Sequence, residues 1–265
     1  MDLRAFQWMF FIIIPAFVSV SGASDIVAGL QNDLNVDELV EKALKKMEEA
    51  EEYASMDLFE KVLTIDADNY EALWNLSLLY SKKGHRLEDR GAMMEDYERA
   101  RDLAELCLEY YPEQADCHYV YAVAIGRIAD ISGTRRRVHA SEEIKDHIDR
   151  TLELEPDHKG GWHLLGVWHA SVANLSRAER WTASLIFGGL PGGASNSKAE
   201  ESLKKAIELY PDNILFHLDL ARFYREVGRT GDAIKVLEKT LGLEVKDMDD
   251  PANLERAKSM LEDLR

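Results

Sequence analysis

The chain contains little positive charge. Its 32 lysines and arginines are outnumbered by 49 aspartates and glutamates, which gives the 265 residues a formal net charge of −17. Such a chain repels phosphate backbones, so we do not expect nucleic acid as a partner. A basic protein, a basic peptide or a cation suits it better, although acid on a helical surface can simply keep the protein soluble.

Motifs of catalysis and of cofactor binding are also lacking. The glycine-rich run at 188–193 has no following Lys-Ser/Thr and no preceding strand, so it is not a phosphate loop. The histidines form no H-E-x-x-H, and His163 and His169 are six residues apart, which places them on different faces of a helix. No nucleophile elbow or Cys-His arrangement is present. We therefore predict a protein that is not an enzyme and has no cofactor and no metal site.

Cysteine occurs at two positions, Cys107 and Cys117, each five residues from Pro112. If Pro112 marks a tight turn between antiparallel helices, the two sulfurs lie at similar heights on neighbouring helices. Spacing does not establish disulfide geometry, so buried free thiols are the expectation. A disulfide, which an exported protein permits, is the alternative.

One long apolar run is present, at the N-terminus. Residues 5–24 carry no charge and end in small residues, with Ser21 and Ala23 spaced like a cleavage site. We expect residues 1–23 to be a secretory signal peptide, followed by a linker over 24–35 and an exported, periplasmic chain. The alternative is an uncleaved membrane anchor, since a run of about 20 residues can span a bilayer. No cysteine follows the run, which argues against a lipoprotein anchor.

Beyond residue 25 the apolar residues recur at spacings of three and four, and sustained alternation is absent. This periodicity predicts helices over 36–265. Pro112, Pro156 and Pro211 interrupt it, and each is followed by an acidic residue and then by Gln, His or Asn. Proline ends one helix, and Asp or Asn caps the next. The intervals of 44 and 55 residues exceed the 34 of a tetratricopeptide repeat, so each unit must contain an insertion.

The segments that follow these breaks match the tetratricopeptide pattern W-x2-L-G-x2-Y, then A-x3-F, then P. The chain is predicted to be an all-α, tetratricopeptide-like solenoid of helix-turn-helix units, wound as a right-handed superhelix. The residues that define the repeats are Leu76, Tyr80, Ala100, Pro112, Pro156, Trp162, Leu165, Gly166, Pro211, Tyr224 and Ala233.

Three additions to the basic repeat are expected. About three turns over 87–97 should lengthen one second helix, which ends near Tyr111. Residues 174–197 should insert an amphipathic helix over 176–187 and a glycine-rich loop. A capping helix should close the C-terminus, with Asp250 as its N-cap and Pro251 at its first helical position.

With these additions, residues 79–265 resemble the regulator of microtubule dynamics family, a tetratricopeptide group. The resemblance rests on the lengthened helix before Pro112, on Leu165-Gly-Val-Trp168 and above all on the segment 180–191. It implies a solenoid fold and a non-enzymatic, protein-binding role. We do not expect microtubule association to be shared, because export removes the chain from tubulin and its net charge disfavours acidic tubulin surfaces. An exported, bacterial relative is expected.

In such solenoids the first helix of each pair lines the concave face. That wall is aromatic and aliphatic with some arginine, which suits a bound peptide or helix. It lacks the clustered Lys and Asn that capture a C-terminal carboxylate. Alternatively, the insertions or residues 26–63 cover part of it. The predicted lining residues are Trp74, Leu78, Tyr119, Val123, Arg127, His163, Val167, Leu218, Arg222 and Arg225.

Two functions remain open. The first is a scaffold or adaptor that binds a protein partner on the concave face. The second is a carrier or sensor of a small hydrophobic ligand, held in a cavity under the 174–197 insertion near Trp168 and Trp181.

Overall fold

Regular structure in the chain is helical wherever the computed structural model describes it, that is, over residues 35–176, 180–181, 184 and 193–265. The expected signal peptide and all but the last residue of the expected linker lie outside these ranges, as do most of the inserted helix and most of the glycine-rich loop. Residues 36–265 form one compact unit. No helix in the described part of the chain is long and apolar enough to cross a membrane.

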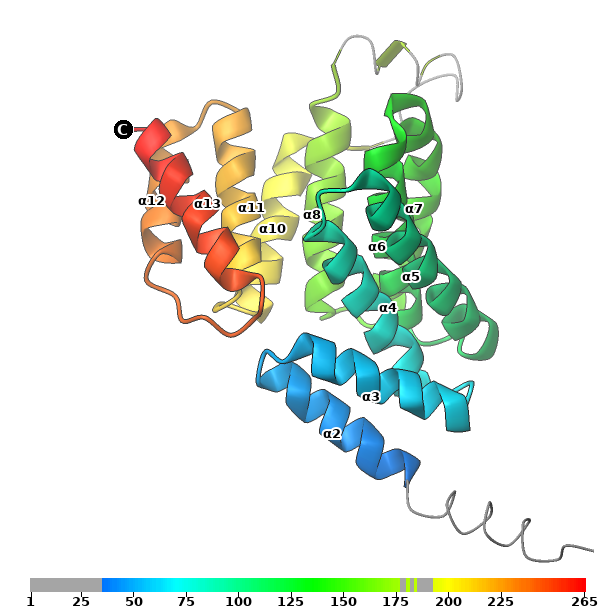
Figure 1. Cartoon of the computed structure of the whole chain (residues 1–265). Helices are drawn as coiled ribbons and strands as arrows, with labels where there is room; N and C mark the ends of the chain where they lie inside the picture. Colours follow the sequence, from blue (N-terminus) through cyan, green and yellow to red (C-terminus); the bar gives the residue numbers. More distant parts are fainter. Residues whose placement is uncertain (1–34, 177–179, 182–183, 185–192) are drawn as a thin grey trace, which may run out of the picture. The chain divides into compact units, whose positions relative to one another are not determined.

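The helices pack as successive antiparallel pairs, which confirms the predicted all-α repeat architecture (Figure 1). In the described part of the chain, a first pair forms an N-terminal hairpin, four further pairs follow, and a single helix comes last. The pairs are α2 (Val36–Glu48) with α3 (Glu52–Ile65), α4 (Tyr70–His85) with α5 (Arg90–Tyr110), α6 (Ala115–Ser132) with α7 (Thr134–Leu154), α8 (Lys159–Ala173) with α10 (Asn196–Leu209), and α11 (Ile214–Glu226) with α12 (Thr230–Thr240), followed by α13 (Asp250–Asp263).

The residues after each break cap the next helix. The side chains of Asn69 and Asn213 accept the backbone N–H three residues on, at 3.1 and 2.9 Å. His158 does the same through Nδ1, which lies 2.8 Å from the N–H of Gly161. These bonds satisfy donors that the first turn of a helix leaves open. Gln114 makes no such bond, so the first helix of its pair begins without a side-chain cap.

The second helix α5 is long, as expected, and ends at Tyr110. It begins at Arg90 rather than at 87, because the carboxylate of Asp89 accepts the N–H of Ala92 at 2.9 Å and fixes the N-cap there. The helix α7 is equally long, with 21 residues, and this was not foreseen. It starts directly after Gly133, whose φ of 93° suits glycine.

The last helix, α13, covers the end of the repeat stack, as predicted for a capping helix. Its Ala257 and Leu261 pack against Leu218 and Leu237 of the pair before it. The predicted N-cap is wrong by one residue: Asp249 is the N-cap and Asp250 is already helical. The carboxylate of Asp250 instead accepts the N–H groups of Lys246 and Asp247, at 2.9 and 2.8 Å, and so organises the preceding loop.

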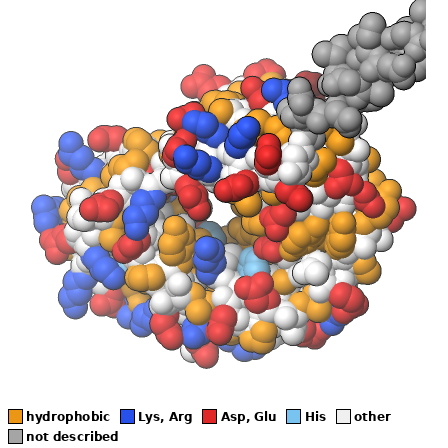
Figure 2. Space-filling model, turned by 90° about the horizontal axis from the view of Figure 1, so that it is seen from below, with side chains coloured by type: hydrophobic (Ala, Val, Ile, Leu, Met, Phe, Trp, Pro, Cys, Tyr) orange, Lys and Arg blue, Asp and Glu red, His pale blue; other side chains and the backbone are white. Residues whose placement is uncertain are grey.

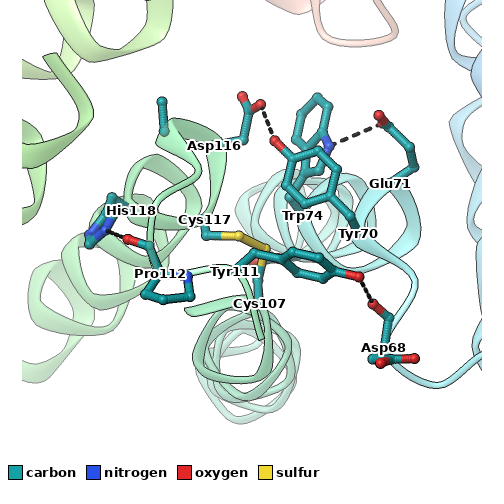
Figure 3. The surroundings of a disulfide bond; sticks show 12 residues. Asp68, Tyr70, Glu71, Trp74, Cys107, Tyr111, Pro112, Asp116, Cys117 and His118 are labelled. Carbon is teal, nitrogen blue, oxygen red and sulfur yellow. Dashed lines mark hydrogen bonds between the residues drawn. A yellow bond between two sulfur atoms is a disulfide. The ribbon is translucent and has the colours of Figure 1, made fainter. Parts of the chain in front are cut away.

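Cys107 and Cys117 form a disulfide between the end of α5 and the start of α6 (Figure 3). The expectation of free thiols is therefore wrong. Their Cα atoms lie 5.3 Å apart, within the range that a disulfide needs, and both residues are fully buried. Beside the bond, the hydroxyl of Tyr111 donates to the carbonyl of Asp68 at 2.8 Å. The disulfide thus ties the second helix of one pair to the first helix of the next.

Candidate functional site

The first helices of the pairs, α4, α6, α8 and α11, contact one another in chain order, and α13 continues the series. The surface that they share is the inner face. Figure 2 shows a hollow whose walls carry hydrophobic, histidine, acidic and basic side chains. Three features of this face follow from its side-chain contacts: two polar networks and a group of arginines.

The first network joins the beginnings of α4, α6 and α8. The carboxylate of Asp116 accepts the hydroxyl of Tyr70 at 2.7 Å and lies 3.1 Å from Nε2 of His158. The ring of Tyr119 packs on that of His158 at a centroid distance of 4.9 Å. Burial raises the pKa of Asp116, but the bonds from His158 and Tyr70 outweigh it, so the pKa lies below its usual value. The network fixes three successive repeats to one another.

The second network joins α8 to α11. Nε2 of His163 lies 2.9 Å from Oδ2 of Asp219. The other carboxylate oxygen, Oδ1, accepts a hydrogen bond from Nη1 of Arg222 at 2.6 Å. The His163 ring stacks on Phe216 with centroids 4.4 Å apart. Burial opposes ionisation of Asp219, yet the bonds to His163 and Arg222 hold its pKa below the usual value. The carboxylate is therefore ionised and positions both side chains.

Arginines gather beyond these networks. Nη1 of Arg127 lies 3.4 Å from Nδ1 of His85 at the end of α4. Burial lowers the pKa of His85 to about 4, and the nearby charges of Arg127, Arg256 and Arg222 contribute to the decrease. The neutral imidazole can therefore accept a hydrogen bond from Arg127.

A depression of about 460 Å³ lies between α11 and α13. Arg225 and Arg256 line it together, with Met260 as an apolar wall. Glu255, Ser259 and Asp263 complete the lining. Arginine side chains therefore occur on α6, α11 and the capping helix, with acidic residues beside those of the depression.

An ion-pair network, here called the latch, joins the two ends of the repeat stack. Nε of Arg86 donates to Asp249 at 2.6 Å, and Nζ of Lys82 lies 2.6 Å from Asp247. Both cations also bind the carboxylate of Glu52, which is 4% exposed. The three carboxylates lie close enough together to suggest a metal site. Lys82 and Arg86 already neutralise the oxygens that a metal ion would need, so we interpret the cluster as a salt-bridge network.

The predicted lining residues fall into three groups. Arg225 is exposed, and Leu218 is fully buried at 0% exposure. Leu218 is therefore wrong as a lining residue, because α13 packs directly onto it. Trp74 and Val167 are half-buried and also pack against core clusters. The other half-buried residues are Leu78, Tyr119, Val123, Arg127, His163 and Arg222.

Sequence reasoning missed several residues of the inner face. Asp219 could have been found, because it lies three residues before Arg222 and so on the same side of one helix. No sequence spacing or motif pointed to Arg256 or His85. Arg256 lies on a helix interpreted only as a cap, and His85 is placed by the approach of α6 and α13. The latch residues come from distant parts of the chain.

The region of the alternative ligand cavity is described only in part. Trp168 is 5% exposed, and its indole donates to the carbonyl of Ser141 at 2.8 Å, so it belongs to the core between α7 and α8. Trp181 is 67% exposed. Residues 177–179, 182–183 and 185–192 of the predicted insertion lie outside the described residues. A second depression, of about 450 Å³, lies on α8 and α10 and is lined by Trp162, Glu201, Lys204, Lys205 and Glu208.

Antiparallel helix pairs, stacked in chain order and closed by a terminal capping helix, define a tetratricopeptide-like α-solenoid. A solved tetratricopeptide protein of Thermus thermophilus shares this fold, with a TM-score of 0.61 at 18% identity, over 85% of this chain and all of that one. Residues 35–265 match the model of the family described as regulator of microtubule dynamics protein 1-3, and the chain belongs to that family.

Individual relatives agree with the family assignment. Regulator of microtubule dynamics protein 3 of Mus musculus is 32% identical over 164 residues, which cover 62% of this chain and 35% of the relative. Regulator of microtubule dynamics protein 2 of Homo sapiens is 25% identical over 209 residues, which cover 77% of this chain and 50% of the relative. The chain thus spans about a third to a half of the length of these relatives. The expected resemblance is confirmed at the level of the family.

Proposed function

We propose that the chain is a non-enzymatic scaffold or adaptor that binds a peptide or helix of a partner protein on its inner face. The observation that carries this proposal is the half-buried set of aromatic, aliphatic and arginine side chains there, among them Trp74, Tyr119, Val123 and Arg127. Aromatic residues and arginine are enriched where proteins bind one another. The regulator family and the tetratricopeptide fold support a protein partner in general. Nucleic acid is disfavoured by the net charge of −17.

A photo-crosslinking residue tests this proposal at two sites. Placed at Val123 on the inner face, it should capture a partner through one continuous segment. Placed at Leu106 of α5, which is 39% exposed and outside the inner face, it should not. The double variant Trp74→Ala with Arg222→Glu should lose the partner while its circular dichroism stays helical. Equal capture from both sites, or full retention of the partner by the double variant, would overturn the proposal.

A second candidate is a carrier of a small hydrophobic ligand beneath residues 174–197. It is supported by the exposed indole of Trp181 and by the apolar residues of this segment. Purified protein should then release a small molecule on denaturation, detected by mass spectrometry. Release of no molecule from natively purified protein would exclude a tightly bound ligand.

We further propose that residues 1–23 direct export and are removed, with an anchored form as the alternative. The uncharged run 5–24 and the small residues Ser21 and Ala23 support this. The mature N-terminus of native material should lie near Ser24. An intact Met1 would contradict cleavage and would restore a role near microtubules, as the names of the relatives suggest. Co-sedimentation with microtubules would then be the direct measurement.

A further inference from the structure

Four arginines on the inner face form what we call the arginine cluster: Arg127 of α6, Arg222 and Arg225 of α11, and Arg256 of α13. Arg225 and Arg256 line one depression, and Arg222 is one helical turn before Arg225. Arg127 contacts His85, and the charges of Arg256 and Arg222 also act on that imidazole, which places these arginines near one another. Four arginines are therefore grouped on one face of a chain whose net charge is −17, with Glu255 and Asp263 beside two of them.

The charges of this cluster are only partly neutralised by the protein itself. Arg222 is bound by Asp219. Arg127 contacts the ring of His85, and Arg256 donates to the amide oxygen of Asn253 at 3.1 Å. Among the residues that the structure describes, no carboxylate lies within ion-pair distance of Arg127, Arg225 or Arg256, although the chain has 49 acidic side chains. These three guanidinium groups have donors to offer a ligand.

The position of His85 agrees with this grouping of arginines, although burial is the largest cause of the shift in its pKa. Burial and the charges of Arg127, Arg256 and Arg222 together lower the pKa of its imidazole to about 4. Asp249 acts in the opposite direction, but it is already bound by Arg86. An anionic group that entered this region would find the guanidinium donors of Arg127, Arg225 and Arg256, with Glu255 and Asp263 at the edge of the same depression.

We propose that the arginine cluster binds an acidic segment of a partner protein, with Asp or Glu carboxylates paired to Arg127, Arg225 and Arg256 and with apolar side chains against Val123 and Met260. The planar guanidinium group offers two parallel donors that match a carboxylate. This inference rests on the proposed function and names the chemistry of the partner. It reverses the sequence-based expectation of a basic partner.

The net charge of −17 does not prevent such binding. At physiological salt the field of a surface charge is screened over about 8 Å, so the groups nearest the ligand dominate once it is in place. The distant acidic residues act mainly on the approach of the ligand, which they slow. Association should therefore be slower than for a basic partner, while the bound state is held by the arginines.

The test uses three labelled amphipathic peptides that share the same leucine positions. The remaining positions are all glutamate in the first peptide, all glutamine in the second and all lysine in the third. Binding to the full chain is followed by fluorescence anisotropy. The glutamate peptide should bind at least about tenfold more tightly than the glutamine peptide, as expected for one or more charge-assisted bonds. The double variant Arg127→Gln with Arg256→Gln should bind the glutamate peptide more weakly, by on the order of tenfold or more. The matched control, Arg150→Gln with Arg265→Gln, removes two arginines outside the inner face and should leave binding unchanged.

The outcomes separate the two proposals. If the glutamine peptide binds as well as the glutamate peptide, and Val123→Glu abolishes both, the inner face binds peptides but the acidic partner is wrong. If the lysine peptide binds best, the partner is basic and the inference is overturned. If no peptide binds and the crosslinker at Val123 captures nothing, both proposals fail. Circular dichroism of each variant confirms that lost binding is not lost folding.

Discussion

Gly166 of α8 faces Leu203 of α10 with no room for a side chain between them. A Cβ added at Gly166 would lie 2.6 Å from Cγ of Leu203 and 2.9 Å from its backbone nitrogen. Since the second contact is to backbone, the two helices would have to move apart. The small residue of the repeat pattern is required here by the close approach of the helices.

Replacement of Gly166 by alanine should therefore destabilise the protein, by about 1–3 kcal/mol of unfolding free energy. Gly126 of α6 provides a matched control, because its added Cβ would come no closer than 3.9 Å, to Cδ1 of Ile144. Gly126→Ala should be neutral or stabilising by up to about 1 kcal/mol, because alanine favours helix. Urea denaturation measures both. Equal effects of the two substitutions would contradict the steric explanation.

Loss of the disulfide between Cys107 and Cys117 should also reduce stability. The bond closes a loop with a sequence separation of 10, for which chain entropy predicts about 2–3 kcal/mol. Urea denaturation of the oxidised protein should show this difference on addition of reductant. The variant with alanine at both positions should not respond to reductant. Two free thiols in denatured, unreduced protein would contradict the bond.

Arg86→Gln should weaken the latch. The substitution removes the guanidinium from Glu52 and Asp249 and leaves the buried carboxylate of Glu52 with Lys82 alone. We expect a loss of roughly 1–3 kcal/mol, as for a buried charged group that loses a partner. Arg265→Gln, which removes an exposed ion pair with Glu238, should cost at most about 1 kcal/mol. Similar urea midpoints for the two variants would show that the latch contributes no more than a surface pair.

Acid should destabilise the protein in part through His169. This side chain is 5% exposed, and burial, aided by the charges of Lys145 and Lys198, lowers its pKa to about 4. The unfolded state therefore takes up the proton first, so stability is lost as the pH falls from about 6.5 towards 4, by about 1–3 kcal/mol from this group. Burial lowers the pKa of further histidines as well, namely His85, His147 and His217.

The measurement is the unfolding free energy in urea at neutral pH and at about pH 5. His169→Gln should reduce the difference between the two values, although the other buried histidines keep part of it. If His169→Gln retains the full acid sensitivity, the buried imidazole is not its source.

Local features of this fold could be predicted from sequence, and features that depend on the angle between repeats could not. The caps at Asn69 and Asn213 act within one helical turn, so the residue type decides them. Whether Cys107 and Cys117 meet depends on how α5 and α6 cross. Leu218 shares its repeat position with Tyr119 and His163, and only the docking of α13 distinguishes it. The pairing of Arg86 with Asp249 depends on small rotations added up over several repeats, which no local pattern encodes.

If a partner binds the inner face as proposed, the latch also restricts its route of entry. Because Arg86 and Lys82 join the start of the repeat stack to the loop before α13, protein surrounds the hollow of Figure 2. A flexible terminal segment can enter the hollow end-first while these ion pairs stay closed. Under the proposed function, a segment between two folded domains would enter only when these ion pairs open, so the inner face would favour a terminus over an internal segment of the same sequence.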